Sequence, residues 1–277
     1  MPSSYDRKNR VDGSCLTDAT CDSMASLATM YVHSTVHMAL LARYVAQCEL
    51  VYRFNTEDTR SGGRPVDVLD VGCNNGAALR LYGSSNFQTQ RRRRIRYLGL
   101  DLDEAALKNA AHNVPSTSYI QSAVFECTDI TQPWPVDDES FDVIWYTEAV
   151  EHVPAEAAPH TLREAFRAAR PGARMLLSTP APFDPDVLVW PESHDHEFSR
   201  EEMRAMIDAA GWRRVDEYGL NTNWTRGRRR LRWSRPEVFE LYEVLRRRIG
   251  GSLARVAAAA LAPEVCDDLV HVCVKDV

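Results

Sequence analysis

The strongest structural signal in the chain is the stretch VDVLDVGCNNGAALRLYG, which runs from Val66 to Gly83. Its first residues are apolar and rich in β-branched valine, as in a buried strand. A turn with two glycines and two asparagines follows, and a helical pattern comes directly after it. Strand, glycine turn and helix in this order suit an anionic or dinucleotide-like ligand, because the first amides of the helix lack partners within it. The spacing Gly72, Asn74, Gly76 is not the GxGxxG of a nicotinamide dehydrogenase.

Composition sets the broad class of the protein. The 277 residues, 44% of them hydrophobic, can bury one substantial core with or without a smaller appendage. The formal net charge of -6 argues against nucleic acid as a bulk electrostatic partner. No apolar run reaches membrane-spanning length, and the first residues lack the apolar segment of a signal peptide, so we expect a soluble cytoplasmic protein without a membrane partner. Seven cysteines without a CxxC pair indicate reduced thiols, and neither a disulfide framework nor a thiolate metal site.

Strands and helices alternate through the middle of the chain. Strands are expected over residues 66–71, 95–102, 123–127, 141–149 and 173–182, and helices over 76–83, 103–113 and 155–170. This alternation predicts an α/β fold, with a parallel sheet that carries helices on both faces. Residues 20–54 predict one long helix or two short ones before it. The later elements are a capped helix at 199–212, a strand at 213–221, a helical stretch at 236–262 and a terminal strand at 268–277.

Three acidic residues fall at the carboxyl ends of the expected strands, where the ligand crevice of an open parallel sheet lies. Asp70 precedes the glycine turn, Asp101 ends the second strand, and Asp129 follows the third. The two oxygens of the Asp101 carboxylate match the two hydroxyls of a ribose, and its charge disfavours the phosphate of NADP.

Over roughly Val66 to Pro180 the chain resembles the class I S-adenosylmethionine-dependent methyltransferases. VLDVGCNNG resembles that family's glycine motif, GLDLD its ribose-binding acid, and CTDITQPWPVDDESFDVIWYTEAVEHV its adenine-flanking acid and the strand that ends in the active-site mouth. Asn74 departs from the pattern, since many members have glycine there. The resemblance implies S-adenosylmethionine as cofactor, with its methionine group beside Gly72 and Gly76. Its methyl group is already activated, so the enzyme contributes alignment and the exclusion of water.

The resemblance also implies a doubly wound, seven-stranded Rossmann-like sheet whose last strand is antiparallel. We predict an N-terminal helical cover (1–60), a cofactor-binding core (61–182), and a region (183–277) that supplies the acceptor-side lid, a helical insertion and the final strands. Cys73 is interpreted as a small residue beside the ligand and not as a nucleophile. The predicted cofactor-binding residues are Asp70, Gly72, Cys73, Asn74, Gly76, Asp101, Leu102, Asp129, Ile130 and Thr147.

The acceptor side is expected after the fourth strand, where YTEAVEHV contains Glu148, Glu151 and His152, and in ESHDHEFSREEM, which contains His194 and His196. The interpretation that we favour has a small-molecule acceptor and no metal. In it Glu148 faces the cofactor, His152 orients the acceptor and His196 belongs to a lid segment. These three are the predicted catalytic residues, and Glu151 is expected on the outer face of its helix.

The same five residues also resemble the small-RNA 3′-terminal 2′-O-methyltransferases, in which they would bind a divalent metal that holds the ribose hydroxyls. That interpretation requires Glu151 to point inward. The arginine run Arg91–Arg96 suits a solvated loop. The run Thr225–Arg235, interleaved with Trp224 and Trp233, suits RNA contacts as well as packing or ion pairs within a lid. An alternative of another class is a non-catalytic cofactor-binding scaffold or partner subunit.

Overall fold

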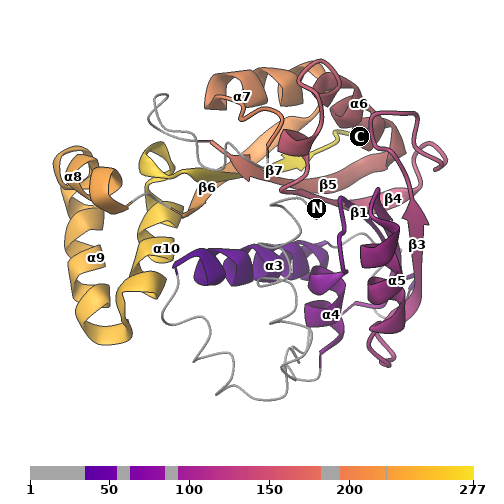
Figure 1. The fold of residues 1–277 in the computed structure, drawn as a ribbon, viewed down its shortest axis with the longest axis horizontal. Coiled ribbons are helices and arrows are strands. Elements are labelled where there is room, and N and C mark those ends of the chain that lie inside the picture. Colours follow the sequence, from indigo (N-terminus) through magenta and orange to yellow (C-terminus); the bar gives the residue numbers. More distant parts are fainter. Residues whose placement is uncertain (1–34, 55–62, 85–92, 182–193, 222–223) are drawn as a thin grey trace, which may run out of the picture.

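The computed structural model describes residues 35–54, 63–84, 93–181, 194–221 and 224–277. A seven-stranded sheet in the order β3-β2-β1-β4-β5-β7-β6 runs through these residues (Figure 1). The strands are β1 (Val66–Val71), β2 (Ile95–Asp101), β3 (Ile120–Cys127), β4 (Phe141–Thr147), β5 (Ala169–Pro180), β6 (Arg213–Asn221) and β7 (Asp268–Val274). β7 is antiparallel to both of its neighbours, β5 and β6, whereas the other pairings are parallel. The predicted doubly wound sheet with an antiparallel last strand is confirmed.

Helices cover both faces of the sheet. On one face, α6 (Ala158–Ala168) and α7 (Arg200–Ala209) share an apolar core with β4 and β5 (Figure 1). On the other face, α3 (Thr35–Arg53), α4 (Ala77–Gly83) and α5 (Glu104–His112) pack against β1 and β2. Cover helix α3 is also tied to the sheet by a polar contact, since the indole nitrogen of Trp145 donates to the carbonyl of Gln47 at 3.0 Å. The part of the predicted helix at residues 20–34 lies outside the described residues.

The C-terminal helices differ from the expected pattern. The arginine-rich segment forms a helix, α8 (Trp224–Ser234), which the sequence did not predict. The helix has few apolar residues, and its buried Leu231 packs with residues of α9, which a local pattern does not reveal. The expected helix over 236–262 is two helices, α9 (Pro236–Ile249) and α10 (Gly251–Leu261). They separate at Gly250, whose φ of 93° is in the left-handed region. Among the described residues, no helix is long and apolar enough to span a membrane.

Helix α6 ends earlier than predicted, at Ala168 and not at Arg170. Ala169 already pairs with Phe141 of β4, so the long β5 begins there. The amide of Gly172 then donates to the carbonyl of Lys275 at 2.7 Å, which holds this part of β5 to the C-terminal residues. A long-range strand pairing therefore ends the helix before the local Pro-Gly signal does.

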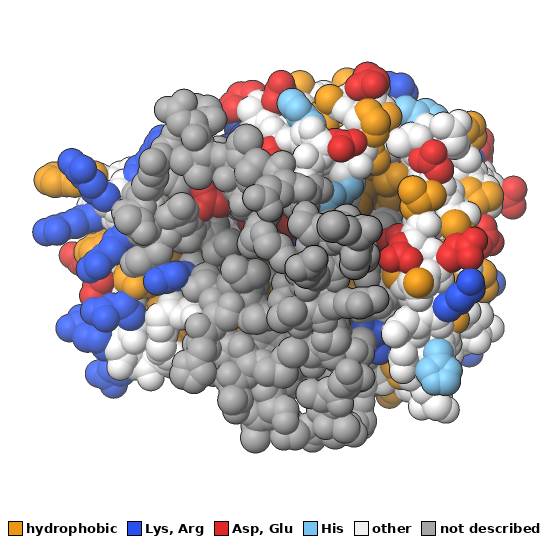
Figure 2. All heavy atoms as spheres, in the orientation of Figure 1, with side chains coloured by type: hydrophobic (Ala, Val, Ile, Leu, Met, Phe, Trp, Pro, Cys, Tyr) orange, Lys and Arg blue, Asp and Glu red, His pale blue; other side chains and the backbone are white. Residues whose placement is uncertain are grey.

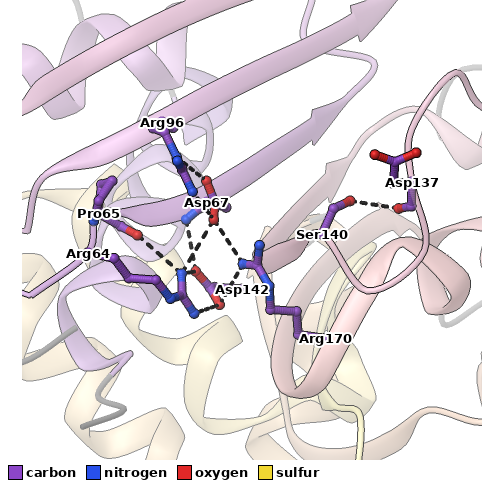
Figure 3. Close-up of polar contacts among 8 residues, drawn as sticks. All are labelled: Arg64, Pro65, Asp67, Arg96, Asp137, Ser140, Asp142 and Arg170. Atoms are coloured by element: carbon purple, nitrogen blue, oxygen red, sulfur yellow. Dashed lines mark hydrogen bonds and ion pairs between the residues drawn. The ribbon is translucent and has the colours of Figure 1, made fainter. Parts of the chain in front are cut away.

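A cluster of ion pairs lies at the amino ends of the strands (Figure 3). Arg64 binds both oxygens of Asp142, at 2.5 and 2.7 Å, and Arg96 binds both oxygens of Asp67, at 2.6 and 2.8 Å. Arg170 bridges the two acids, at 2.9 Å to Asp67 and 3.0 Å to Asp142. Burial acts to raise the pKa of Asp142, but Arg64 and the amide of Asp67 outweigh it and hold this pKa below its usual value. Arg96 therefore belongs to a paired cluster on β2 and not to a solvated loop; Arg91 and Arg92 lie outside the described residues.

Candidate active site

The glycine turn between β1 and α4 has the backbone that its residue types allow. Gly72, Asn74 and Gly76 have φ values of 71°, 47° and 72°, in the left-handed region. A Cβ on Gly72 would lie 2.5 Å from the Cβ of Ala149, so only glycine fits there. Asparagine tolerates the left-handed region better than most residues, which explains how Asn74 fits a position of the turn that favours glycine.

Asp101 connects the turn to the end of β2. One carboxylate oxygen accepts the amide of Asn74 at 2.8 Å, and the other accepts the amide of Asp103 at 2.9 Å. Asp103 in turn caps α5 by accepting from the amides of its first turn. The next residue after Asp101, Leu102, is 69% exposed although it is apolar. The carboxylate is thus fixed at the carboxyl end of β2, beside the exposed apolar side chain of Leu102.

Two predicted residues lie beneath the turn and not at its surface. Asp70 is 4% exposed and accepts a hydrogen bond from the Tyr97 hydroxyl at 2.7 Å. Burial raises the pKa of Asp70 to about 7, although the Tyr97 hydrogen bond acts to lower it. Burial also raises the pKa of the Cys73 thiol, which makes it a poor nucleophile, in agreement with its interpretation as a small packing residue.

The remaining predicted cofactor residues lie just after β3, which pairs with β2, and at the end of β4, which pairs with β1. Asp129 is exposed, and one of its oxygens accepts the amide of Thr131 at 2.9 Å. Ile130 is half-buried against the core. Thr147 is half-buried at the last position of β4, opposite Ser178 of β5. The roles of these residues in cofactor binding stay predictions.

Glu148 has a strained backbone and a buried cationic partner. Its φ is 52°, and its side chain accepts the Ser178 hydroxyl at 2.8 Å. Arg43 of α3 lies 3.3 Å from Glu148 and 3.1 Å from Asp268 of β7, which joins three elements. Burial and the charge of Glu148 raise the pKa of Asp268 to about 7 in spite of Arg43. Sequence reasoning missed Arg43 and Asp268, although an arginine inside the apolar run MALLARYVAQ is a signal of a buried partner.

Glu151 points inward, so its predicted position on the outer face of a helix is wrong. Residues 150–152 form a single 3-10 turn (η3) and not part of an α-helix, and this turn directs Glu151 into the protein, where it is 0% exposed. The Thr179 hydroxyl donates to its Oε2 at 3.1 Å, whereas Oε1 has no hydrogen-bond partner among the described residues. Burial and the charge of Glu148 raise its pKa well above the usual value.

Two histidines lie beside Glu151. The rings of His152 and His194 are 5.0 Å apart, and one potential ligand atom from each of Glu151, His152 and His194 lies within 4.8 Å of the others. The backbone explains this meeting of distant residues, because the amides of Asp195 and His196 both donate to the carbonyl of Glu151. The ring of His196 instead contacts Phe198, at 4.5 Å between centroids.

The five predicted acceptor-side residues therefore separate into three groups. Glu148 belongs to the Arg43 cluster, Glu151 lies with His152 and His194, and His196 packs on Phe198. This arrangement does not bring the three predicted catalytic residues, Glu148, His152 and His196, into one cluster.

The arginines of α8 make contacts within the C-terminal helices. Arg228 pairs with Glu243 of α9 at 3.1 Å, and the guanidinium of Arg232 lies 6.0 Å from the centre of the Phe239 ring. Trp233 is 80% exposed. Figure 2 shows basic side chains gathered at the end of the molecule formed by α8 and α9. The ion pair and the ring contact agree with the interpretation of this segment as packed within the chain.

The glycine turn after β1, the acid that ends β2 and the order of the seven strands together define a class I methyltransferase domain. Residues 69–177 match the family model described as "Methyltransferase domain". The chain therefore contains a domain of the class I S-adenosylmethionine-dependent methyltransferases.

Named relatives agree with this assignment. The chain is 32% identical over 120 residues to the 27-O-demethylrifamycin SV methyltransferase of Amycolatopsis mediterranei, a match that covers 43% of this chain and 39% of that protein. It is 31% identical over 165 residues to a Mycolicibacterium smegmatis protein named "Probable S-adenosylmethionine-dependent methyltransferase", covering 58% and 56%. It is 30% identical over 131 residues to the ubiquinone biosynthesis O-methyltransferase of Pseudomonas savastanoi pv. phaseolicola, covering 46% and 50%. The chain thus spans about half the length of these relatives or less.

Solved structures share the fold. The crystal structure of the [4+2]-cyclase SpnF superposes with a TM-score of 0.54 at 21% identity, over 83% of this chain and 80% of that chain. Because that protein is named as a cyclase, the likeness supports the fold and not an activity.

Proposed function

We propose that this chain transfers a methyl group from S-adenosylmethionine to a small-molecule acceptor. The observation that carries the cofactor assignment is Asp101, whose two oxygens accept the amides of Asn74 and Asp103 and are thereby fixed beside the glycine turn at the end of β2. A carboxylate has about four lone-pair sites, so each oxygen can still accept one ribose hydroxyl. The relatives named for rifamycin and ubiquinone support a small-molecule acceptor.

The residues present fit this cofactor. Gly72 and Gly76 give the turn an open backbone on which the methionine group would lie, and the exposed Leu102 offers an apolar face for the adenine. Asp129, beyond β3, would accept from the adenine amine, and Ile130 and Thr147 would line the same crevice. When bound, S-adenosylmethionine supplies a methyl group that its positive sulfur already activates. The contribution of the chain is then to hold the acceptor in line and to exclude water.

On the acceptor side, His152 would orient the acceptor. Glu148 is held by Ser178 and Arg43, and its side chain would lie in a fixed position between the acceptor and the cofactor. His196 would act from the segment that precedes α7. The runner-up acceptor, an RNA terminus, is favoured by the inward position of Glu151, but the contacts of Arg228 and Arg232 within the C-terminal helices weaken the case for an RNA surface there.

The proposal is tested by calorimetric titration of the full chain with S-adenosylmethionine. Asp101→Ala should weaken binding by about 1.5–3 kcal/mol, the usual range for hydrogen bonds to a charged group. The matched control is Asp103→Ala, which removes an acid two residues away that caps α5 but keeps the backbone amide that donates to Asp101. We expect the control to bind within about threefold of wild type, a difference of about 0.6 kcal/mol.

A wild-type chain that does not bind S-adenosylmethionine would refute the proposed function, and equal losses in both variants would remove Asp101 from the site. Transfer of labelled methyl groups to a small-molecule extract, and not to RNA, would support the favoured acceptor class. Binding without transfer to either pool would indicate the non-catalytic scaffold.

A further inference from the structure

The cluster of Glu151, His152 and His194 is unusual because one carboxyl oxygen of its buried acid has no hydrogen-bond partner among the described residues. Glu151 is 0% exposed, and its Oε1 has no hydrogen-bond partner among the described residues. A buried polar atom without a partner costs about 1–3 kcal/mol, and more if the group is charged. Thr179 holds the other oxygen, so the carboxylate does not turn freely toward solvent. A ligand with a positive charge would remove this cost.

The neighbouring histidine is arranged as metal-binding histidines are. The Nδ1 of His194 lies 2.9 Å from Oε1 of Glu197, and both side chains are almost fully buried, at 7% and 2% exposure. A carboxylate on one ring nitrogen fixes the tautomer and leaves the other nitrogen as a metal donor, which is the usual support of a metal-bound histidine. Because Nδ1 of His194 is held by Glu197, Nε2 is the ring nitrogen left to bind a ligand.

We propose that Glu151, His152 and His194 bind a divalent transition-metal ion, with Glu197 as the residue that orients His194. One carboxylate and two imidazoles suit Zn²⁺ and its first-row neighbours, whereas Mg²⁺ and Ca²⁺ prefer oxygen ligands. The three potential ligand atoms lie within 4.8 Å of one another. Ligands of a tetrahedral ion with bonds of about 2.1 Å lie about 3.4 Å apart, so the side chains need to move inward by about 1 Å.

The geometry excludes two of the five residues that the sequence offered as ligands. Glu148 is occupied by Arg43 at 3.3 Å and by the Ser178 hydroxyl. The ring of His196 packs on Phe198 and lies outside the cluster of ligand atoms. The site is therefore a three-ligand site, and three protein ligands leave at least one coordination position open for another molecule.

An open coordination position on the metal would indicate the class of acceptor that binds, an inference that rests on the proposed function. A cation there would lower the pKa of an acceptor hydroxyl, so the acceptor atom would be a hydroxyl oxygen. In the transfer, the O–H bond breaks and its proton goes to solvent. A bond forms between oxygen and the methyl carbon, and the C–S bond breaks with its electron pair left on sulfur. The products are a methyl ether and S-adenosylhomocysteine.

Metal binding is tested directly on the full chain after removal of metals by a chelator. Co²⁺ is titrated and followed by its visible absorption, and Zn²⁺ is then added as a competitor. We expect one Co²⁺ per chain, displaced by one Zn²⁺. Glu151→Gln and His194→Gln should each raise the dissociation constant of Co²⁺ at least about a hundredfold, and Glu197→Gln should raise it about 10- to 100-fold.

The matched control is His196→Gln, which removes an imidazole two residues from His194 and should bind Co²⁺ within about threefold of wild type. Thermal denaturation of each variant checks that it is folded, and His194→Gln and Glu197→Gln keep the proposal testable if Glu151→Gln does not fold. The proposal is overturned if wild type binds no Co²⁺ at one site, if the Glu151, His194 and Glu197 variants bind as wild type does, or if His196→Gln loses as much affinity as His194→Gln.

Titration of the same metal-free samples with S-adenosylmethionine separates this proposal from the proposed function. The cofactor should bind metal-free protein with unchanged affinity, since Asp101 and the glycine turn share no residue with the metal cluster. Loss of cofactor binding with intact Co²⁺ binding would refute the function alone, and the reverse result would refute the metal site alone.

Discussion

Buried carboxylates have opposite surroundings at the two ends of the parallel strands. We call the end at which these strands begin the amino edge and the end at which they finish the carboxyl edge. At the amino edge, Asp67 and Asp142 are each bound by more than one arginine, and the pKa of Asp142 is held below its usual value. At the carboxyl edge, Glu151 forms no ion pair with a described residue, and the pKa values of Asp70 and Glu151 are raised although Arg43 acts to lower that of Glu151. Charges that are satisfied within the chain stabilise the fold, whereas charges left unsatisfied are available to a ligand. This difference supports the proposed placement of the active site at the carboxyl edge.

The largest expected effect compares one buried acid from each edge. Asp142→Asn should lower the free energy of unfolding by about 3 kcal/mol, because it removes a charge that Arg64 and Arg170 share. This loss of about 3 kcal/mol lies at the low end of the range for a broken buried ion pair, since both arginines are partly exposed. Glu151→Gln should change it by less than about 1 kcal/mol, because one oxygen already lacks a partner. Urea denaturation of the metal-free chain at pH 7 measures both, and equal losses would contradict the contrast between the edges.

The second prediction uses pH to distinguish the edges. Asp70 has a pKa of about 7 in the folded chain and an ordinary value of 3.8 when exposed. Between these values the folded chain binds a proton that the unfolded chain has released, so this group's contribution to stability is lost as the pH rises through 7. Asp70→Asn should abolish about 2 kcal/mol of the decrease in unfolding free energy between pH 5 and pH 7. Asp142 has a lowered pKa, so the stability that it contributes is lost only when the pH falls below the ordinary pKa of an aspartate. It should therefore contribute nothing to the change in unfolding free energy between pH 5 and pH 7.

Denaturant titrations of the cofactor-free chain at pH 5 and pH 7 provide the measurement for this pH prediction. The control is Asp142→Asn, which should be less stable than wild type by the same amount at both pH values. If Asp70→Asn and wild type show the same difference between pH 5 and pH 7, Asp70 is ionised throughout, and the contrast between the edges does not hold for it.

Much of the fold could be predicted because its signals are local. The valine-rich strand β1, the glycine turn and the capping box of Ser199 and Glu202 each lie within a few residues of sequence, and the structure confirms them. The start of β5 could not be predicted, because pairing of Ala169 with β4 overrides the local Pro-Gly signal. Helix α8 was missed for the same reason, since its stability comes from packing against later helices.

The candidate site divides in the same way. The position of Asp101 at the end of β2 was predicted from the sequence, and the structure adds its hydrogen bond to the amide of Asn74. Arg43 and Asp268 were missed because their ion pair joins residues 225 positions apart. The inward direction of Glu151 was missed because an ExxEH pattern does not distinguish a 3-10 turn from an α-helix. Sequence therefore predicts the strand ends, but long-range contacts determine which side chains meet there.

A smaller effect is expected at the capping box that starts α7, just after the segment with His194. Ser199 accepts the amide of Glu202, and the Glu202 side chain accepts the amide of Ser199 at 2.8 Å. Ser199→Ala should lower the free energy of unfolding by about 1 kcal/mol, the usual cost of a lost N-cap. Co²⁺ affinity should stay within about threefold of wild type, because the amides of Asp195 and His196 hold the segment to Glu151 independently. Loss of Co²⁺ binding in this variant would show that α7 and not η3 positions His194.

The smallest effect is expected at the exposed rim of the amino-edge cluster. Arg96 binds both oxygens of Asp67 but is 46% exposed, so water replaces much of the interaction when the side chain is removed. Arg170 remains 2.9 Å from Asp67, so this carboxylate keeps a cation. Arg96→Ala should therefore lower the free energy of unfolding by no more than about 1 kcal/mol, with a smaller difference in high salt, because salt screens exposed pairs. Urea denaturation at low and high salt measures it. A loss as large as that of Asp142→Asn would mean that the exposed pair at Arg96, and not the buried pairs of Asp142, stabilises this edge of the sheet.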